Sequence, residues 1–521
     1  MLYHIENKSN VHIVVDCDVD GYTSAAEIYL YLQSLGANLK LSYSVHQGKK
    51  HGLSSDIHVP EETNLLIIPD AGSNDVEQCK KLSESGMDIL VLDHHECDIE
   101  NLYAIIVNNQ MCDYPNKQLS GAGVTYKFLQ ALDSELWEDK SSKYLDLVAL
   151  GLISDNMKVT SLETRYLVDS GMSCIRNKMF KAFIDAQAYS LGNNFSAKDI
   201  QFYVSPLING LIRAGDLEEK DMMFRAFIET DEVFEYKKSK DAVPVSESIY
   251  DRIARISNNA KNRQNKTKDK SIGIIISDIE RRGQHNNKII FSNVTESLSQ
   301  SLTGITAIKI AEYFHKPCLL LRKKSADEAE KDAPVIYSGS GRNIDNSPVT
   351  NLKDFLEELN LFEFVQGHQG AFGCEIKKDN IPLAITEINK RLKDVDFTPF
   401  IACDFILDED DLTIGLVKDI YDLRNYFGTG FNEPIIAVEK LCVRPDQFTL
   451  MGKENSSWKI ITDEGVAIVK FKVKENDALK VAMQKGSDDV YITVVGRANI
   501  NSFKGILTSQ LVVMDYEIEV M

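Results

Sequence analysis

Residues 15–26 read VDCDVDGYTSAA and place three aspartates on alternate positions where an apolar run meets a glycine. In an extended segment alternate side chains share one face, so Asp16, Asp18 and Asp20 converge unless the strand ends among them. Like charges so close together repel each other, and a bound cation is the usual remedy. An Asp-rich turn that faces solvent is the alternative, and this stretch alone leaves both readings open.

The rest of the chain has the composition of an ordinary globular protein. It has 521 residues, of which 43% are hydrophobic, enough for about three or four domains with real cores. The first ten residues, MLYHIENKSN, are polar and unlike a signal peptide, and no apolar run approaches the roughly 18 residues that cross a bilayer. We therefore expect a cytoplasmic protein with no membrane partner.

Cysteine spacing and charge exclude two further classes. The nine cysteines are scattered without a C-x-x-C pair, which argues against a disulfide framework or a zinc knuckle. The formal net charge of −20 argues against broad, nonspecific coating of nucleic acid. It leaves room for a local basic channel or a metal-lined cleft, because carboxylates that hold divalent ions still count as negative.

Short apolar runs alternate with helical patterns through the first third of the chain. This alternation predicts an α/β domain with a parallel sheet, whose ligands bind beyond the carboxyl ends of the strands. The expected strands are VHIVVD (11–16), NLLIIPD (64–70), DILVLDHH (88–95) and YAIIVNN (103–109), and the expected helices are residues 21–36, 74–86 and 121–137.

Three of these strands end in acids or histidines. Asp16 to Asp20 follow the first strand, Asp70 follows the second, and Asp93-His94-His95 follow the third. Ser154-Asp155 closes the apolar helix YLDLVALGLI in the same manner. Independent strands have no reason to terminate alike unless their ends meet at one place, so we expect one shared site.

The chain as a whole divides into four expected parts, of which the α/β domain described above is the first. We expect a catalytic domain at 1–229, a basic helical connector at 230–270 that could track a phosphate backbone, a smaller α/β domain at 271–398 and an OB-like β-barrel at 399–521. The α/β part is expected to include strands SIGIIIS (271–277) and KPCLLLR (316–322) and two Gly-rich segments, SGSGRN (338–343) and QGHQGAFG (366–373).

Taken in order, D-x-D-x-D-G, an Asp after a strand, Asp-His-His and Ser-Asp resemble the four motifs of the DHH phosphoesterase superfamily. Other segments resemble RecJ-type single-strand DNA exonucleases, including the Gly-rich motifs of the DHH-associated domain and the entry to the OB-fold. The remaining segments that carry this resemblance are VHQGKKHGL (45–53), LSGAGVTYKFL (119–129), PLINGLIRAGD (206–216), TGITAIKIAEYFHKPCLLL (303–321) and YFGTGFNEP (426–434).

The resemblance implies two divalent cations, Mn²⁺ or Mg²⁺. Oxygen ligands suit both ions, and an imidazole among them favours Mn²⁺. Residues implied as ligands are Asp16, Asp18 and Asp70 for one ion and Asp20, Asp70, His94 and Asp155 for the other, with Asp70 bridging. His95 is implied to touch the scissile phosphate, and Asp93 to fix a histidine tautomer.

The resemblance also implies residues that bind the substrate. They are Arg342, Ser340, Gly341, His368, Gly367 and Arg213; Arg213 is equally consistent with a structural ion pair. The sequence departs from the family pattern at Gln366, at Phe372 and in the segment 209–213, which bears on substrate preference. Phe427, Phe431 and Trp458 are candidates for stacking on bases, or else core residues of the barrel.

The implied activity is 5′-to-3′ hydrolysis of single-stranded DNA to mononucleotides, in repair, recombination or replication. Two alternatives stay open: a phosphodiesterase for short RNA oligonucleotides or cyclic dinucleotides, and a non-catalytic replication or repair scaffold. The expected partner is single-stranded DNA, with a single-strand-binding protein, a helicase or another replication protein as further possibilities.

Overall fold

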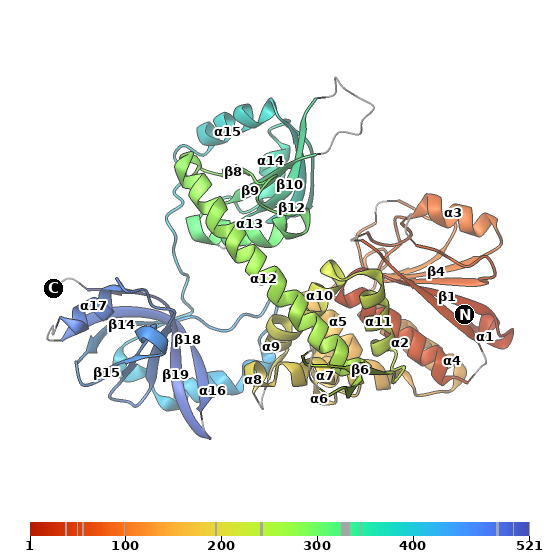
Figure 1. Cartoon of the computed structure of the whole chain (residues 1–521), viewed down its shortest axis with the longest axis horizontal. Helices are drawn as coiled ribbons and strands as arrows, with labels where there is room; N and C mark the ends of the chain where they lie inside the picture. Colours follow the sequence, from red (N-terminus) through yellow and green to blue (C-terminus); the bar gives the residue numbers. More distant parts are fainter. Residues whose placement is uncertain are drawn as a thin grey trace. The chain divides into compact units, whose positions relative to one another are not determined.

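A computed structural model of the chain (Figure 1) contains two compact units, Met1–Lys261 together with Cys403–Met521, and Asn262–Ala402. Each unit is described by itself. The structure describes residues 1–36, 39–48, 50–54, 57–97, 99–192, 195–239, 243–324, 334–344, 346–485, 489–503 and 505–519, apart from the side chains of residues 267, 301 and 503.

The first sheet has five parallel strands in the order β2-β1-β3-β4-β5. The chain therefore steps from β1 to β2 on one side and continues through β3 on the other, which makes the β1/β3 boundary a topological switch point. The strands are β1 (Asn10–Val15), β2 (Lys40–Val45), β3 (Leu65–Pro69), β4 (Asp88–Asp93) and β5 (Ile105–Asn108).

Both faces of this sheet are covered, as parallel sheets require. Val11, Ile13 and Val15 of β1 join a core with the helices α2, α4 and α5, whereas Val14 packs on the opposite face with Cys79 of α3. The helices are α1 (Leu2–Glu6), α2 (Val19–Ser34), α3 (Val76–Glu84), α4 (Gly121–Leu136), α5 (Leu145–Ser154), α6 (Leu162–Ser173), α7 (Lys178–Ala186), α8 (Ala188–Leu191), α9 (Ala197–Asp199), α10 (Ser205–Ala214) and α11 (Leu217–Phe227), with a π-helical turn at Ile200–Val204.

The four strands expected from apolar runs are confirmed, and so are the helices at α2, α3 and α4. Strand β2 was not indicated by an apolar run, because its sequence KLSYSV alternates polar and apolar residues and its side chains are only partly buried. It lies at the edge of the sheet beside β1.

The connector differs from its expected form. A hairpin, β6 (Val233–Tyr236) and β7 (Val245–Ser248), precedes one long helix, α12 (Ile249–Arg281). The expected strand at 271–277 is wrong, since these residues belong to α12. Ile275 and Ile279 stand one helical turn apart and are buried in one core cluster, so helical spacing outweighs the β-propensity of isoleucine.

The second unit contains a mixed sheet in the order β11-β12-β10-β9-β8. Only the pair β8 and β9 is parallel. The elements are β8 (Ile290–Asn293), α13 (Thr303–Phe314), β9 (Cys318–Lys323), β10 (Ile336–Arg342), α14 (Leu352–Glu357), β11 (Phe362–His368), β12 (Ala371–Lys377) and α15 (Asn380–Arg391).

The C-terminal part forms a seven-stranded sheet in the order β13-β14-β18-β19-β17-β16-β15. Trp458 and Phe427 are buried in its core, so neither is available to stack on a base, whereas Phe431 is exposed. The elements are β13 (Phe405–Leu407), α16 (Ile414–Asp422), β14 (Ile436–Val443), β15 (Phe448–Met451), β16 (Ser457–Ile461), β17 (Ala467–Phe471), α17 (Ala478–Gln484), β18 (Val490–Phe503) and β19 (Ile506–Ile518).

Within the described ranges, the helices lack the length and apolar character that a bilayer span requires.

Candidate metal centre

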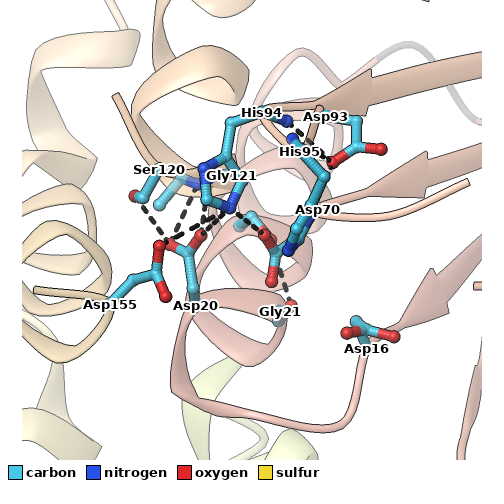
Figure 2. Close-up of polar contacts among 12 residues, drawn as sticks. Asp16, Asp20, Gly21, Asp70, Asp93, His94, His95, Ser120, Gly121 and Asp155 are labelled. Carbon is cyan, nitrogen blue, oxygen red and sulfur yellow. Dashed lines mark hydrogen bonds and ion pairs between the residues drawn. The ribbon is translucent and has the colours of Figure 1, made fainter. Parts of the chain in front are cut away.

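The acidic residues expected to share a site do converge at the carboxyl edge of the first sheet. Asp16 follows β1, Asp70 follows β3, Asp93 ends β4, and Asp155 caps the carboxyl end of α5. Figure 2 shows Asp20, Asp70, His94 and Asp155 facing one another, with Asp16 to one side. The site therefore lies at the switch point, where the strand order predicts a ligand.

Asp16 is held by the segment that follows β2. Its Oδ1 accepts a hydrogen bond from the Gly52 backbone N–H at 3.0 Å, and His46 Nε2 lies 3.6 Å from the same oxygen. Its Oδ2 lies 2.5 Å from His51 Nδ1. Hydrogen bonds to Asp16 and Cys17 raise the pKa of His51 to about 11. Of the segment 45–53 that resembles the family, Lys49 lies outside the described residues.

Asp18 and Asp20 are positioned by helix N-termini. Asp18 caps α2 by accepting the Gly21 N–H at 3.0 Å. Asp20 accepts three hydrogen bonds at the start of α4, from Ser120 Oγ (2.8 Å) and from the backbone N–H groups of Gly121 (2.5 Å) and Ala122 (3.1 Å). Exposed N–H groups and the helix dipole favour negative charge there.

Asp70 adopts the left-handed conformation, with φ at +68°. Asp tolerates this region better than most residues, but it is an uncommon conformation that clusters at functional sites. Its neighbour Gly121 has no side chain, and a Cβ there would lie 2.5 Å from Asp70 Cβ. The αL turn and the glycine together place this carboxylate against the start of α4.

His94 lies among three carboxylates. Its Nε2 is 3.2 Å from Asp70 Oδ1, 3.6 Å from Asp155 Oδ2 and 3.9 Å from Asp20 Oδ2. Burial lowers the pKa of His94 although the Asp20 charge opposes this, so the ring favours its neutral form. A neutral imidazole is the form that binds metals.

Asp93 and His95 form a hydrogen-bonded pair, and His95 also brings a ring nitrogen within 4.8 Å of ligand atoms of Asp70 and His94. Asp93 accepts hydrogen bonds from the backbone N–H groups of Ser73, His94 and His95 and from His95 Nδ1 at 2.8 Å. Burial alone would raise the pKa of Asp93, but these bonds and the His95 charge outweigh it and lower the pKa. The bond to Asp93 raises the pKa of His95 to about 9. The histidine that Asp93 orients is therefore His95.

The donor atoms fit hard divalent cations. Asp16, Asp18 and Asp70 bring ligand atoms within 4.8 Å of one another, and so do Asp20, His94 and Asp155. Asp70 Oδ1 is buried and has no hydrogen-bond donor among the described residues. Burial and the neighbouring carboxylates raise the pKa of Asp70, and burial together with Asp20 and Asp18 raises that of Asp155 to about 8. Cations among these oxygens would relieve that repulsion.

The expected substrate residues of the second unit gather at the ends of β10 and β11. Arg342 and His368 are both paired in register with Ala371 of β12. Ser340 Oγ lies 3.2 Å from Thr303 Oγ1 at the start of α13, and Arg342 Nη1 donates to the Gly341 carbonyl at 2.7 Å.

The glycines here have packing reasons of their own. A Cβ at Gly341 would enter the Phe372 ring. Gly367 has φ at +132°, and a Cβ there would lie 2.9 Å from the Ala371 carbonyl oxygen. Packing against the Phe372 ring at Gly341 and against the backbone of β12 at Gly367 is therefore reason enough for glycine at both positions, whether or not a phosphate binds there.

Arg213 is exposed in the last turn of α10. Sequence reasoning did not single out His46, His51 or Ser120 as site residues. The two histidines could have been found from their position just after β2, because β2 runs parallel to β1 and its carboxyl end lies at the same sheet edge as Asp16.

Two family models match the chain: the DHH family, N-terminal domain, at residues 10–152, and the RecJ OB domain at residues 403–515. The "Putative SPbeta prophage-derived single-strand DNA-specific exonuclease YorK" of Bacillus subtilis (strain 168) is 35% identical over 523 residues, which cover 100% of this chain and 89% of the relative.

More distant relatives share the same architecture. The single-stranded-DNA-specific exonuclease RecJ of B. subtilis is 25% identical, covering 98% of this chain and 62% of that protein. A crystal structure of RecJ in complex with Mn²⁺ from Thermus thermophilus matches with a TM-score of 0.72 at 18% identity, covering 100% of this chain and 70% of that one. At this identity the match describes the fold.

Proposed function

Because this chain belongs to the family of RecJ-type single-strand DNA-specific exonucleases of the DHH superfamily, we propose that it is a metal-dependent nuclease. Its substrate is single-stranded DNA, which it hydrolyses from the 5′ end to 5′-mononucleotides. The observation that carries this proposal is the pair of donor groups at one sheet edge, Asp16, Asp18 and Asp70 beside Asp20, His94 and Asp155.

In this proposal the first group would hold one divalent cation and the second group would hold another, and Asp70 would contribute to both. Asp70 suits the shared position because it belongs to the first group and its Oδ1 is 3.2 Å from His94 of the second. When bound, such a pair of cations supplies a hydroxide at neutral pH and neutralises charge on the phosphate. The six side chains fix where the substrate phosphate must lie.

His95 contributes a positive charge beside the metal centre. Its pKa of about 9, raised by the hydrogen bond to Asp93, keeps the imidazole protonated at neutral pH. Its side chain is half exposed, so a substrate can reach it. We propose that His95 contacts a phosphate oxygen of the scissile bond and that Asp93 orients His95.

We further propose that Ser340, Gly341, Arg342, Gly367 and His368 bind the phosphate backbone of the substrate, with Arg213 as an additional contact. Burial lowers the pKa of Arg342, yet a guanidinium stays charged, and its fork suits a phosphate. The C-terminal sheet is proposed to bind the strand beyond the cleaved nucleotide.

The cellular role is proposed on the same basis. The nine cysteines are free thiols, which supports a reducing compartment such as the cytoplasm. Repair, recombination or replication is the setting we propose, with a single-strand-binding protein, a helicase or another replication protein as partner.

A cleavage assay tests this function. Single-stranded DNA labelled at either end is incubated with the full chain and Mn²⁺, Mg²⁺ or EDTA. We expect labelled mononucleotide from the 5′-labelled strand at the earliest times, and none with EDTA. His94→Ala should abolish release, whereas Cys112→Ser, an exposed position outside the site, serves as the matched control.

Release of mononucleotide first from the 3′-labelled strand would contradict the proposed polarity. Cleavage that persists in EDTA, or in His94→Ala, would contradict the metal assignment. If long DNA resists cleavage while dinucleotides are hydrolysed, the substrate class proposed here is wrong.

A further inference from the structure

A second kind of donor set surrounds Asp16, made of Cys17, His51 and Asp16 itself. Cys17 Sγ is 3.6 Å from His51 Nε2 and 3.7 Å from His51 Nδ1, and His51 Nδ1 is 2.5 Å from Asp16 Oδ2. The three residues bring one ligand atom each within 4.8 Å of one another. Unlike the other groups at this edge, this one contains sulfur.

The donor types and spacing suit zinc. Zinc binds Cys sulfur at about 2.3 Å and His nitrogen at about 2.0–2.1 Å in a tetrahedron, which places the sulfur and nitrogen about 3.5 Å apart. The sulfur lies 3.6 Å from one ring nitrogen of His51 and 3.7 Å from the other, so the ring has to turn before one nitrogen faces a metal shared with Cys17. The 2.5 Å contact between His51 and Asp16 has to widen, and the His51 side chain, which is 59% exposed, is free to turn.

We propose that Cys17, His51 and Asp16 form a zinc site that shares Asp16 with the first of the two groups proposed to hold catalytic cations. Three protein ligands leave one position for water, as in other open zinc sites. Thiolate and imidazole select zinc over magnesium, calcium and manganese, which prefer oxygen.

Local structure holds the three residues together. Cys17 is nearly buried between the end of β1 and the start of α2. Gly52 has φ at +59°, a conformation that glycine adopts without strain, and its N–H binds Asp16. The next N–H, of Leu53, donates to Asp75 Oδ2 at 2.7 Å. The segment that carries His51 is therefore held in place by two backbone hydrogen bonds, one to Asp16 and one to Asp75.

The expected consequence is inhibition, a step that rests on the proposed nuclease function. Asp16 belongs to both the zinc group and the first catalytic group. Zinc on Asp16 Oδ2 draws this carboxylate toward Cys17 and competes with the catalytic cation for it. Zinc at low concentration should therefore slow a reaction run in excess Mn²⁺.

The test uses the full chain and two probes, Co²⁺ and Zn²⁺. Cobalt bound to a thiolate gives a charge-transfer absorption band, which reports binding without any nuclease activity. We expect the band in the wild type and in Cys112→Ser, and its loss in Cys17→Ser. The zinc concentration for half-inhibition should rise at least about tenfold in Cys17→Ser, since even indirect partners of a metal change affinity by this much.

The outcomes separate the zinc site from the proposed function. A band of wild-type intensity in Cys17→Ser overturns the site, and so does its absence from the wild type. If the wild type cleaves no DNA but shows a band that depends on Cys17, the zinc site stands and the nuclease proposal fails. Should Cys17→Ser not fold, as judged by circular dichroism, His51→Gln replaces it, and an undiminished band there also overturns the proposal.

Discussion

Asp70 combines an uncommon backbone conformation with a buried carboxylate that is surrounded by like charge. Its φ is +68°, and burial together with Asp20 and Asp18 raises its pKa. A fold that keeps such a group has to neutralise it, and the cations proposed for this site would do so. Activity and stability are therefore expected to change in opposite directions when the charge is removed.

The variant Asp70→Asn tests this opposition. It retains the size and the αL tolerance of the side chain but removes the charge proposed to serve both cations. We expect the cleavage rate to fall by more than about 100-fold, the upper range for partners that touch a metal only indirectly. The melting temperature of the chain in EDTA should stay the same or rise. A lower melting temperature together with retained activity would contradict the role given to Asp70.

His12 provides a pH dependence that lies outside the metal centre. It is buried in β1, with Nδ1 2.8 Å from Ser42 Oγ and Nε2 2.9 Å from Ser44 Oγ, and burial lowers its pKa to about 4. In the unfolded chain the pKa is about 6.5. Between these values the unfolded state binds more protons, so stability is present above about pH 6.5 and is lost as the pH falls toward 4.

Comparison of the wild type with His12→Gln isolates this contribution. At pH 5 the wild type should have lost about 2 kcal/mol of unfolding free energy relative to its value at pH 8, beyond any loss in the variant. Urea unfolding in EDTA at the two pH values measures this difference. Equal losses in both proteins would show that His12 does not titrate as its burial requires.

At the scale of elements, the segment 426–433 links the C-terminal sheet to the metal centre. The loop after Asp155 is paired with it through the Val159 N–H and the Thr429 carbonyl at 3.0 Å. Lys198 Nζ adds an ion pair to Glu433 at 2.6 Å. Gly430 has φ at +82°, and a Cβ there would lie 3.2 Å from Lys158 Cβ. The C-terminal part therefore supports the loop that carries a proposed metal ligand.

Gly430→Val should disturb this support. We expect the Mn²⁺ concentration for half-maximal cleavage to rise about 10-fold or more, as for other partners that orient a metal ligand, with a smaller loss at saturating Mn²⁺. Gly505→Val is the matched control, because Gly505 has φ at +81° and a Cβ there would meet no other atom of the described residues within 4 Å. Equal effects of the two substitutions would attribute the change to backbone strain alone.

The elements that sequence predicted best are those whose apolar runs bury both faces. The three interior runs, in β1, β3 and β4, and the acids at their ends follow directly from strand alternation and strand termination. The edge strand β5 was also found, because its sequence is apolar although it is only partly buried. The strand at 40–45 was not predicted, because an edge strand does not need a continuous apolar run. Residues 271–277 were predicted as a strand because isoleucine favours strands, but in the structure a long helix buries these isoleucines on one face. The contact of His51 with Asp16 depends on β2 pairing with β1, which composition does not encode.

The stability of helix α12 tests whether residues 271–277 form a helix rather than the expected strand. Gly273 is an exposed helical residue with open space where a Cβ would lie, so Gly273→Ala should stabilise the chain by about 0.5–1 kcal/mol. Gly304→Ala in α13 is the counterpart, because its methyl would lie 2.7 Å from Arg342 Nη2 and should give no gain. Urea unfolding followed by circular dichroism compares the two. A strand at 271–277 would gain nothing from the first substitution.

For the whole molecule, the net charge of −20 sets how DNA is held. An acidic protein repels the phosphate backbone at long range, so binding has to come from local contacts spread along the strand. An OB-type domain supplies such contacts over roughly 4–16 nucleotides. A matching family model at residues 403–515 places this kind of domain after the catalytic parts.

Dependence on substrate length follows from this arrangement. We expect KM to fall as oligonucleotides lengthen from two nucleotides to the span of the binding groove, about 4–16 nucleotides, and to level off beyond it, while kcat changes little. Phe431 is exposed, with its ring centre 5.4 Å from the Arg165 guanidinium, so it can stack on a base. Phe431→Ala should therefore raise KM for long strands and leave dinucleotides unaffected. A KM that is constant from dinucleotides upward would favour a small-substrate phosphodiesterase, in which the C-terminal sheet binds something other than DNA.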